Sequence, residues 1–430
     1  MRITNRTAIA AAMLCTASAA SAAPTYIHAG RLIAVPGQPV RGASTIIVDG
    51  GRILSVNQGH TAPPAGALLI DLRDKTVLPG LIDSHVHLAS DRGGEAGLLS
   101  FVREEPQMNA LEAQMNGMKT LRAGFTTVRN LGDEGATLAL REAIKRGWVQ
   151  GPRIVDAASS ISTTGGHMDG RGGLNDDLVA HLPSPENLCD GVDSCRKVVR
   201  RQIDRGADVI KFATTGGVNS GTGLATRMSE DEARALVATA HAYGRKVAVH
   251  AHGADGIKLA LRAGADSIEH GTVMDDEILR TMKKQGTYYV PTLSTVNGYL
   301  ERLAANPNAY APDVKKQIDW RIGITGQSLR KAVPAGVKIA FGTDAGVSKH
   351  GRNADEFELL VKYGMTPVEA IKAATVNAAD LLGLAAEIGT VEVGKSADII
   401  GVSGDPLADV SALKRVDFVM AKGETITAAR

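Results

Sequence analysis

In the middle of the chain, short apolar runs alternate with stretches of helical character, and this alternation most constrains the fold. There are eight such runs: 77–84, 126–129, 153–156, 209–212, 247–250, 267–270, 288–291 and 339–342. Two of the helical stretches begin with capping boxes, Ser229-x-x-Glu232 and Thr366-x-x-Glu369, and Gly383 stands where the last helix should end. Eight β/helix units predict an α/β fold, a (β/α)8 TIM-like barrel that collects ligands at the C-terminal ends of its strands.

Both ends of the chain have a different sequence pattern, in which short predicted strands are separated by glycine. These strands are expected at 30–35, 44–53, 389–402 and 416–420. Neither end is long enough to form a stable sheet alone, so we expect the two to pair in one small β-sandwich domain. The predicted organisation is therefore a β-sandwich from 23–78 and 387–430 around a barrel at 79–386.

Residues 1–22 have the pattern of a secretory signal peptide. Arg2 and Arg6 precede an apolar stretch at 8–17, and Ala20-Ser21-Ala22 fits a cleavage site. An ordinary amphipathic N-terminal helix is the alternative. The signal predicts a periplasmic or secreted protein. A net charge of +2 gives no indication of a nucleic-acid partner or of an anionic membrane.

Two cysteines remain after that segment, Cys189 and Cys195, in a loop-like stretch. A disulfide is the simplest expectation for an even pair in an exported protein. A zinc-binding pair is the alternative, although no further ligands lie nearby in the sequence.

Polar residues of metal-binding type fall at the ends of the predicted strands. His85 and His87 are two apart at the end of the first strand, so both rings face the same side. Lys211 interrupts an apolar run, and a buried lysine is costly unless its charge is neutralised or paired. The other members of the set are His250, His270 and Asp344. Their shared location at the C-terminal barrel end predicts one metal-binding site.

Taken together, these motifs make the chain similar to the metal-dependent amidohydrolase superfamily. The motifs are LPGLIDSHVH at 78–87, GFTTVR at 124–129, TGGH at 164–167, VIK at 209–211, VHAHG at 249–253, IEHG at 268–271, GTD at 342–344 and GKSADI at 394–399. The most similar branch contains Xaa-Pro and Xaa-Arg carboxypeptidases and ochratoxin-degrading amidohydrolases.

The resemblance implies a site for two divalent metal ions, with zinc the natural choice and manganese or cobalt as alternatives. His85, His87 and Asp344 would hold one ion, and His250 and His270 the other. Lys211, as N6-carboxylysine, would bridge them. His252 would face the pocket and touch substrate; the alternative exchanges the roles of His250 and His252.

The implied reaction is amide hydrolysis by a metal-bridging hydroxide. Asp344 would act as general base towards that hydroxide and then as general acid towards the leaving amine. His167, after a Gly-Gly turn, is a candidate to stabilise the oxyanion or to bind a substrate carboxylate, with a structural loop histidine as the alternative. The remaining histidines, His28, His60, His181, His241 and His350, are expected to be surface or loop residues.

The segment after the fourth predicted strand bears on substrate preference. Relatives that remove C-terminal amino acids carry a Gln-Tyr-Ser-like segment after the fourth strand, whose tyrosine helps to hold the substrate carboxylate; here the segment reads Arg227-Met228-Ser229. A methionine adapts to bulky apolar groups, so Arg227 and Met228 are predicted to bind substrate.

The favoured substrates are N-acyl-amino acids or C-terminal peptide bonds, including ochratoxin A, cleaved to ochratoxin alpha and phenylalanine. A cyclic amide, lactone or organophosphate hydrolase is the alternative, and a non-catalytic metal-binding barrel is a further one. Relatives in the branch often form octamers, so a homo-oligomer is expected.

Overall fold

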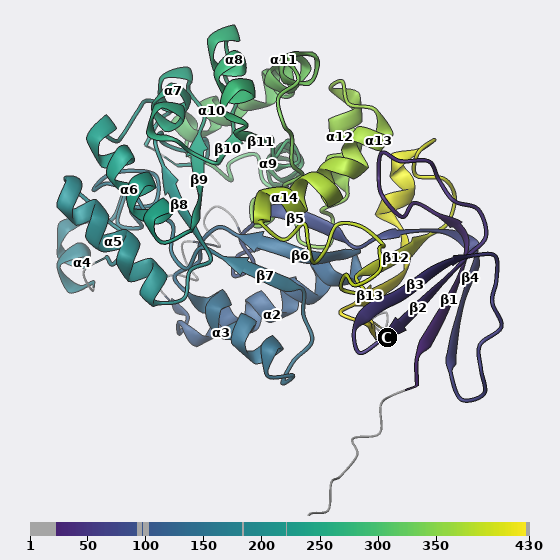
Figure 1. The fold of residues 1–430 in the computed structure, drawn as a ribbon. Helices are drawn as coiled ribbons and strands as arrows, with labels where there is room; N and C mark the ends of the chain where they lie inside the picture. Colours follow the sequence, from purple (N-terminus) through teal and green to yellow (C-terminus); the bar gives the residue numbers. More distant parts are fainter. Residues whose placement is uncertain (1–22, 93–96, 98–102, 183–184, 221, 427–430) are drawn as a thin grey trace, which may run out of the picture.

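The computed structural model describes residues 23–92, 97, 103–182, 185–220 and 222–426, so the predicted signal peptide lies outside the described residues. Two parallel sheets form the middle of the molecule (Figure 1). One contains β5 (Leu81–Val86), β6 (Phe125–Asn130) and β7 (Arg153–Asp156). The other contains β8 (Val209–Ala213), β9 (Lys246–Ala251), β10 (Ser267–His270) and β11 (Tyr288–Val290). Seven of the eight predicted barrel runs therefore contain strands.

The eighth run, at 339–342, pairs without forming a regular strand. Ile339 bridges Tyr289 of β11 in parallel, and Ala345 bridges Val86 of β5. On the far side, Ile161 bridges Phe212 of β8, which connects the two sheets beyond β7. These single bridges join the two parallel sheets in the order expected for an eightfold β/α array. A regular, closed eight-stranded barrel is the part of the prediction that the strand pairing does not show.

Helices alternate with the strands, and Figure 1 shows α2 and α3 beside the first sheet and α5 to α8 around the second. The bounds are α2 Gln107–Arg122, α3 Ala136–Lys145, α4 Asp176–His181, α5 Val192–Asp204, α6 Glu230–Ala242, α7 Ala254–Ala263, α8 Asp276–Gln285, α9 Thr295–Ala305, α10 Pro312–Gly323, α11 Gln327–Ala335, α12 Asp355–Lys362, α13 Pro367–Lys372 and α14 Ala378–Leu382. Both predicted capping boxes are present, at Ser229 and Thr366, and Gly383 ends α14 at φ 74°. Among the described residues, no helix is both long and apolar enough to span a bilayer.

The two ends of the chain meet in one seven-stranded sheet, ordered β14-β13-β12-β4-β1-β2-β3. Its strands are β1 (Thr25–Leu32), β2 (Ser44–Asp49), β3 (Arg52–Gln58), β4 (Leu68–Pro79), β12 (Ile399–Val402), β13 (Val416–Ala421) and β14 (Glu424–Thr425). Strand β4 joins the ends, since it pairs with β1 in parallel and with β12 antiparallel. The predicted pairing of the ends is thus confirmed. A second packed layer, which a sandwich requires, stays a prediction.

The first predicted barrel strand, 77–84, is divided between two sheets. Val77, Leu78 and Pro79 pair with β12 in the terminal sheet, and β5 begins only at Leu81. Gly80 lies at the division, where a Cβ would come within 2.2 Å of Thr126 Oγ1. Because glycine alone fits this close approach, the chain can cross from one sheet to the other here.

Candidate active site

A cavity of about 180 Å³ lies at the C-terminal ends of the central strands. His85, Lys211, His250 and His270 reach it from β5, β8, β9 and β10, since strand order places these ends together. The full lining is His85, His87, His167, Met168, Lys211, Val218, Asn219, His250, His252, His270, Thr295, Tyr299, Arg321, Asp344 and Val347. A wider hollow of about 410 Å³ adjoins it and shares three of these residues, His87, Asn219 and Val347.

His85, His87 and Asp344 form the first group of metal-ligand type, with ligand atoms within 4.8 Å of one another. Asp344 Oδ1 lies 3.4 Å from the Nε2 atom of both histidines. Lys211 Nζ lies 3.4 Å from His85 Nε2, so the lysine amine sits beside this group.

His250, His252 and His270 form the second group, again with ligand atoms within 4.8 Å of one another. The ring of His250 lies 4.6 Å from that of His270 and 4.7 Å from that of His252, measured between centroids. All three rings line the cavity, as does Lys211. Both His250 and His252 therefore belong to this group, and the geometry does not distinguish which of the two is a metal ligand and which contacts substrate.

A ring nitrogen of each histidine is bound to the surrounding protein. His85 Nδ1 contacts Glu269 Oε2 at 2.8 Å, and His87 Nδ1 contacts the Gly132 carbonyl at 2.8 Å. His252 and His270 contact Thr272 and Thr292 hydroxyls, each at 2.7 Å. His250 Nε2 contacts the Gly216 carbonyl at 3.2 Å. Such outer hydrogen bonds fix the tautomer and orientation of metal-binding imidazoles, so the donor set fits divalent cations.

Burial keeps these rings uncharged. It holds the pKa of His85, His250, His252 and His270 well below the usual histidine value, and neighbouring positive charges act in the same direction. Burial also lowers the pKa of Lys211 to about 8. Neutral imidazoles offer the lone pair that a metal ion requires.

The backbone is strained at the cavity. His270 and Asp344 have φ values of 67° and 56°, and Thr292, which binds His270, has 48°. Non-glycine residues rarely adopt this left-handed region, and such strain concentrates at functional sites. Three strained residues at the ends of three neighbouring strand segments thus indicate a site that the surrounding structure holds in place.

Beneath the cavity lies a buried charge network that the sequence did not predict. Glu269 is fully buried and binds His85 with one carboxylate oxygen and Arg129 with the other, at 2.8 Å each. Arg129 also donates to the Ser84 carbonyl and to Ser267. An acidic residue within the apolar run 267–270 was the available signal, because a buried carboxylate needs a partner. The network fixes the position of the His85 ring.

His167 lies where the sequence placed it, in the loop after β7. Its ring packs 4.3 Å from that of His250, and Nδ1 contacts Ser220 Oγ at 3.1 Å. A Cβ at Gly217 would come 2.0 Å from the His167 ring, so this approach requires glycine. Burial lowers the pKa of His167 to about 4, which leaves the ring neutral.

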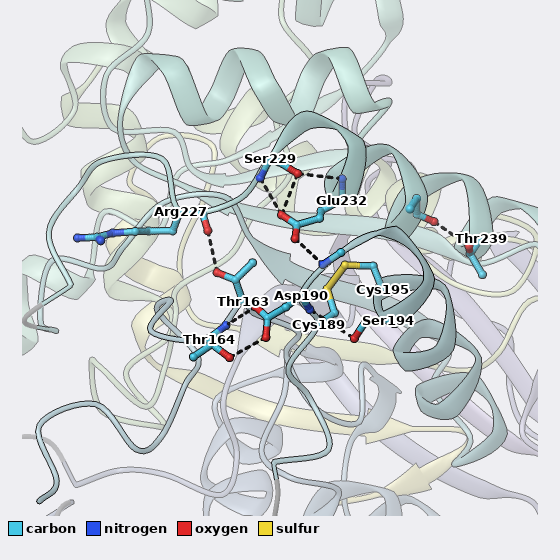
Figure 2. The surroundings of a disulfide bond; sticks show 12 residues. Thr163, Thr164, Cys189, Asp190, Ser194, Cys195, Arg227, Ser229, Glu232 and Thr239 are labelled. Atoms are coloured by element: carbon cyan, nitrogen blue, oxygen red, sulfur yellow. Dashed lines mark hydrogen bonds between the residues drawn. A yellow bond between two sulfur atoms is a disulfide. The ribbon is translucent and has the colours of Figure 1, made fainter. Parts of the chain in front are cut away.

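The predicted disulfide between Cys189 and Cys195 is confirmed, and it borders the His167 loop (Figure 2). The Cys189 amide donates to the Ser162 carbonyl at 2.8 Å, and Asp190 accepts from the amide and the hydroxyl of Thr164. The disulfide joins this segment to the first turns of α5. It thereby stabilises one side of the loop that carries His167.

Arg227 and Met228, predicted to bind substrate, do not line the cavity. Met228 is buried in the apolar core instead. The Arg227 carbonyl accepts from Thr163 at 2.7 Å, while its guanidinium donates to the Thr222 carbonyl and extends away from the disulfide (Figure 2). The cavity lining thus gives no support to a contact between these two residues and substrate, and that contact stays a prediction. Met168, which sequence reasoning missed, is the methionine of the cavity.

Two of the histidines expected at the surface or in loops are buried. His28 is in β1, binds the Thr61 carbonyl at 2.8 Å and stacks on His60. His350 is in a loop but binds the carbonyls of His87 and Ser90, at 3.1 Å each. The expectation is wrong for His28, which is a buried strand residue, and it holds for His350, which is a loop residue although its ring is buried. Backbone carbonyls contact a ring nitrogen of each. His60, His181 and His241 are exposed, as expected.

A buried carboxylate supports the wall of the cavity and gives a pH prediction. Glu356 of α12 accepts from the amides of Leu293 and Ser294, at 2.9 and 2.6 Å, just before α9. Burial raises its pKa to about 7. A carboxyl whose pKa is raised on folding contributes stability at low pH that is lost as the pH rises through the folded pKa.

We therefore expect the free energy of unfolding to lose about 3 kcal/mol from this group between pH 5 and pH 8. Glu356→Gln should remove that component, so its urea-unfolding profile against pH is flatter than that of the wild type. Glu358→Gln, an exposed change on the same helix, should keep the wild-type slope. Parallel profiles for wild type and Glu356→Gln would contradict the assignment.

Comparison with known proteins agrees with this geometry. Residues 76–426 match the amidohydrolase family. The chain is 32% identical over 419 residues to the ochratoxinase of Aspergillus niger, covering 93% of this chain and 85% of that protein. It is similar to the solved structure of a Xaa-Pro dipeptidase with methionine bound in the active site, at 40% identity and a TM-score of 0.89, covering 94% and 100% of the two chains. The crystal structure of A. niger ochratoxinase gives 29% identity and a TM-score of 0.81, covering 94% and 96%.

Proposed function

The chain belongs to the amidohydrolase family, and on that premise we propose that it cleaves the amide bond of N-acyl-amino acids or the C-terminal bond of peptides. Hydrolysis of amides or peptides is the activity that the family and its ochratoxinase and dipeptidase relatives support. The proposed substrates and mechanism rest on one observation: the two three-residue groups of metal-ligand type line the same cavity as Lys211. Ochratoxin A, an N-acyl-phenylalanine, is our proposed test substrate because an ochratoxinase is among the relatives.

We assign His85, His87 and Asp344 to one divalent metal ion, and His250 and His270 to a second, both zinc. Two such ions supply Lewis-acid polarisation of the scissile carbonyl and a water acidified towards neutrality. His252 is left to face the substrate, and its contact with Thr272 orients its ring.

Lys211 is proposed to be carboxylated, and in that form it would help to hold the two ions. The reaction adds carbon dioxide to the neutral amine, forms an N–C bond and releases one proton. Burial favours the neutral amine, since it lowers the pKa of Lys211 to about 8. The resulting carbamate would turn a costly buried cation into an oxygen ligand for both ions.

Asp344 is proposed as the general base and acid. Its carboxylate faces the cavity beside His85 and His87, with Oδ1 at 3.4 Å from each ring. It takes a proton from the attacking water and delivers it to the leaving nitrogen, which departs as a neutral amine. His167 is proposed to donate a hydrogen bond to the developing oxyanion; its contact with Ser220 and its neutral ring support this role.

Export and assembly belong to the same proposal. The N-terminal pattern at 1–22 supports a periplasmic or secreted location, which agrees with a disulfide between Cys189 and Cys195. We also propose a homo-oligomer, on the resemblance of the sequence alone.

The test is a product analysis by mass spectrometry. Zinc-loaded protein and chelator-treated protein are each incubated with ochratoxin A, N-acyl-amino acids, dipeptides, hydantoins, lactones and phosphotriesters. We expect free amino acids from the first three classes, and only with metal-loaded protein. Turnover confined to hydantoins, lactones or phosphotriesters would overturn the proposed substrate class.

A further inference from the structure

Arg321 of α10 is a buried cation that has no carboxylate partner in the part of the chain that the structure describes. The residue is 2% exposed and lines the same cavity as the two groups of metal-ligand type. Its Nη1 donates to Thr325 Oγ1 at 3.1 Å. Among the described residues, no carboxylate oxygen lies within ion-pair distance of its guanidinium, and Nε and Nη2 have no hydrogen-bond partner. Neither nitrogen is among the fully buried polar atoms without a partner, and Arg321 is a residue of the cavity lining.

A buried guanidinium without a carboxylate partner is expected to bind an anion. Removing a charge from water without a partner costs several kcal/mol, and buried arginines are therefore normally paired with carboxylates or phosphates. The fork of a guanidinium matches the two oxygens of a carboxylate. Lys211 and Arg321 are the lysine and arginine of the described lining, and Lys211 is already assigned to the metals.

The surroundings of Arg321 define the rest of the ligand. Tyr299 lines the same cavity, and burial raises the pKa of its phenol, which therefore stays a neutral hydrogen-bond donor. Met168, Val218 and Val347 supply apolar surface in the same space. The wider hollow beyond His87 is larger, at about 410 Å³, and leaves room for a bulky acyl group. The inner cavity thus suits the amino-acid part of a substrate, with one carboxylate and an apolar side chain.

We propose that Arg321 binds the α-carboxylate of the amino acid that is released, and so restricts the enzyme to N-acylated, apolar amino acids with a free carboxyl group. This inference rests on the proposed function and deepens it. The scissile amide is then presented to Asp344 from the inner side, with the acyl group towards the wider hollow.

The test compares two substrates that differ only in that carboxylate, N-benzoyl-L-phenylalanine and N-benzoyl-L-phenylalaninamide, with benzoate release as the readout. Wild type should prefer the acid by roughly 100-fold in kcat/KM. Arg321→Met should lose this preference, through a higher KM for the acid and a nearly unchanged rate for the carboxamide. Arg321→Lys keeps the positive charge but not the two-pronged guanidinium. Its preference for the acid should lie between that of the wild type and that of Arg321→Met.

Lys316→Met is the matched control, since Lys316 is exposed on the same helix. It should behave as wild type. Equal loss on both substrates in Arg321→Met, or a wild type that does not discriminate between them, would overturn the inference. If wild type hydrolysed neither compound, the proposed function would fail first.

Calorimetric binding of L-phenylalanine and L-phenylalaninol tests Arg321 independently of turnover. The inference expects wild type to bind the acid more tightly, and Arg321→Met to bind the two alike. An unchanged difference between the two ligands in Arg321→Met would overturn it.

Discussion

Asp344→Asn should lower kcat for N-acyl-amino acid hydrolysis by roughly 100- to 10,000-fold, with little change in KM. Asparagine preserves the shape of the side chain but cannot accept the proton of the attacking water. The carboxylate faces the cavity beside His85 and His87, at 3.4 Å from the Nε2 atom of each. Among the described residues that line the cavity, no other carries a carboxylate that could replace it. The measurement is steady-state hydrolysis with zinc in excess.

Two controls make this result specific. Asp276→Asn removes an exposed carboxylate at the start of α8 and should leave kcat unchanged. The metal content of Asp344→Asn, measured alongside, separates loss of the proton acceptor from loss of an ion. A variant that retains both ions and more than a tenth of the wild-type kcat would show that another group transfers the proton.

Arg129→Met should destabilise the fold by about 3–5 kcal/mol, because it leaves the buried Glu269 carboxylate without its cationic partner. The pair is 2.8 Å apart, and both side chains are almost wholly buried. Urea unfolding at neutral pH measures the change. Since Glu269 also positions His85, activity should fall as well.

The matched control is Arg146→Met, which breaks an exposed i,i+4 pair with Glu142 on α3. Its expected cost is about 0.5 kcal/mol or less. The double variant Arg129→Met/Glu269→Gln should recover part of the stability, since it removes the unpaired charge together with its partner. If Arg129→Met cost no more than Arg146→Met, the buried network would have no role in stability.

Local sequence patterns predicted where the residues of metal-ligand type would lie. The spacing of His85 and His87 puts both rings on one side of a strand, and parallel connectivity brings Lys211, His250, His270 and Asp344 to the same end. Those rules depend on the period of a strand and on chain order alone.

The features that the sequence did not reveal depend on long-range packing. Arg129 and Glu269 are 140 residues apart and meet only inside the folded protein. Arg321 comes from α10, and a helical arginine usually points to solvent. Met228 packs in the apolar core, and the direction of a side chain in an irregular segment has no periodic signal in the sequence. The division at Gly80 depends on its contact with Thr126.

Hydrolysis of an amide bond at a site for two metal ions can be tested with metal-free protein that is titrated with zinc, while N-benzoyl-L-phenylalanine hydrolysis is followed at each addition. We predict no turnover without metal and activity that saturates at about two ions per chain. Full activity in metal-free protein, or saturation at a single ion, would contradict it.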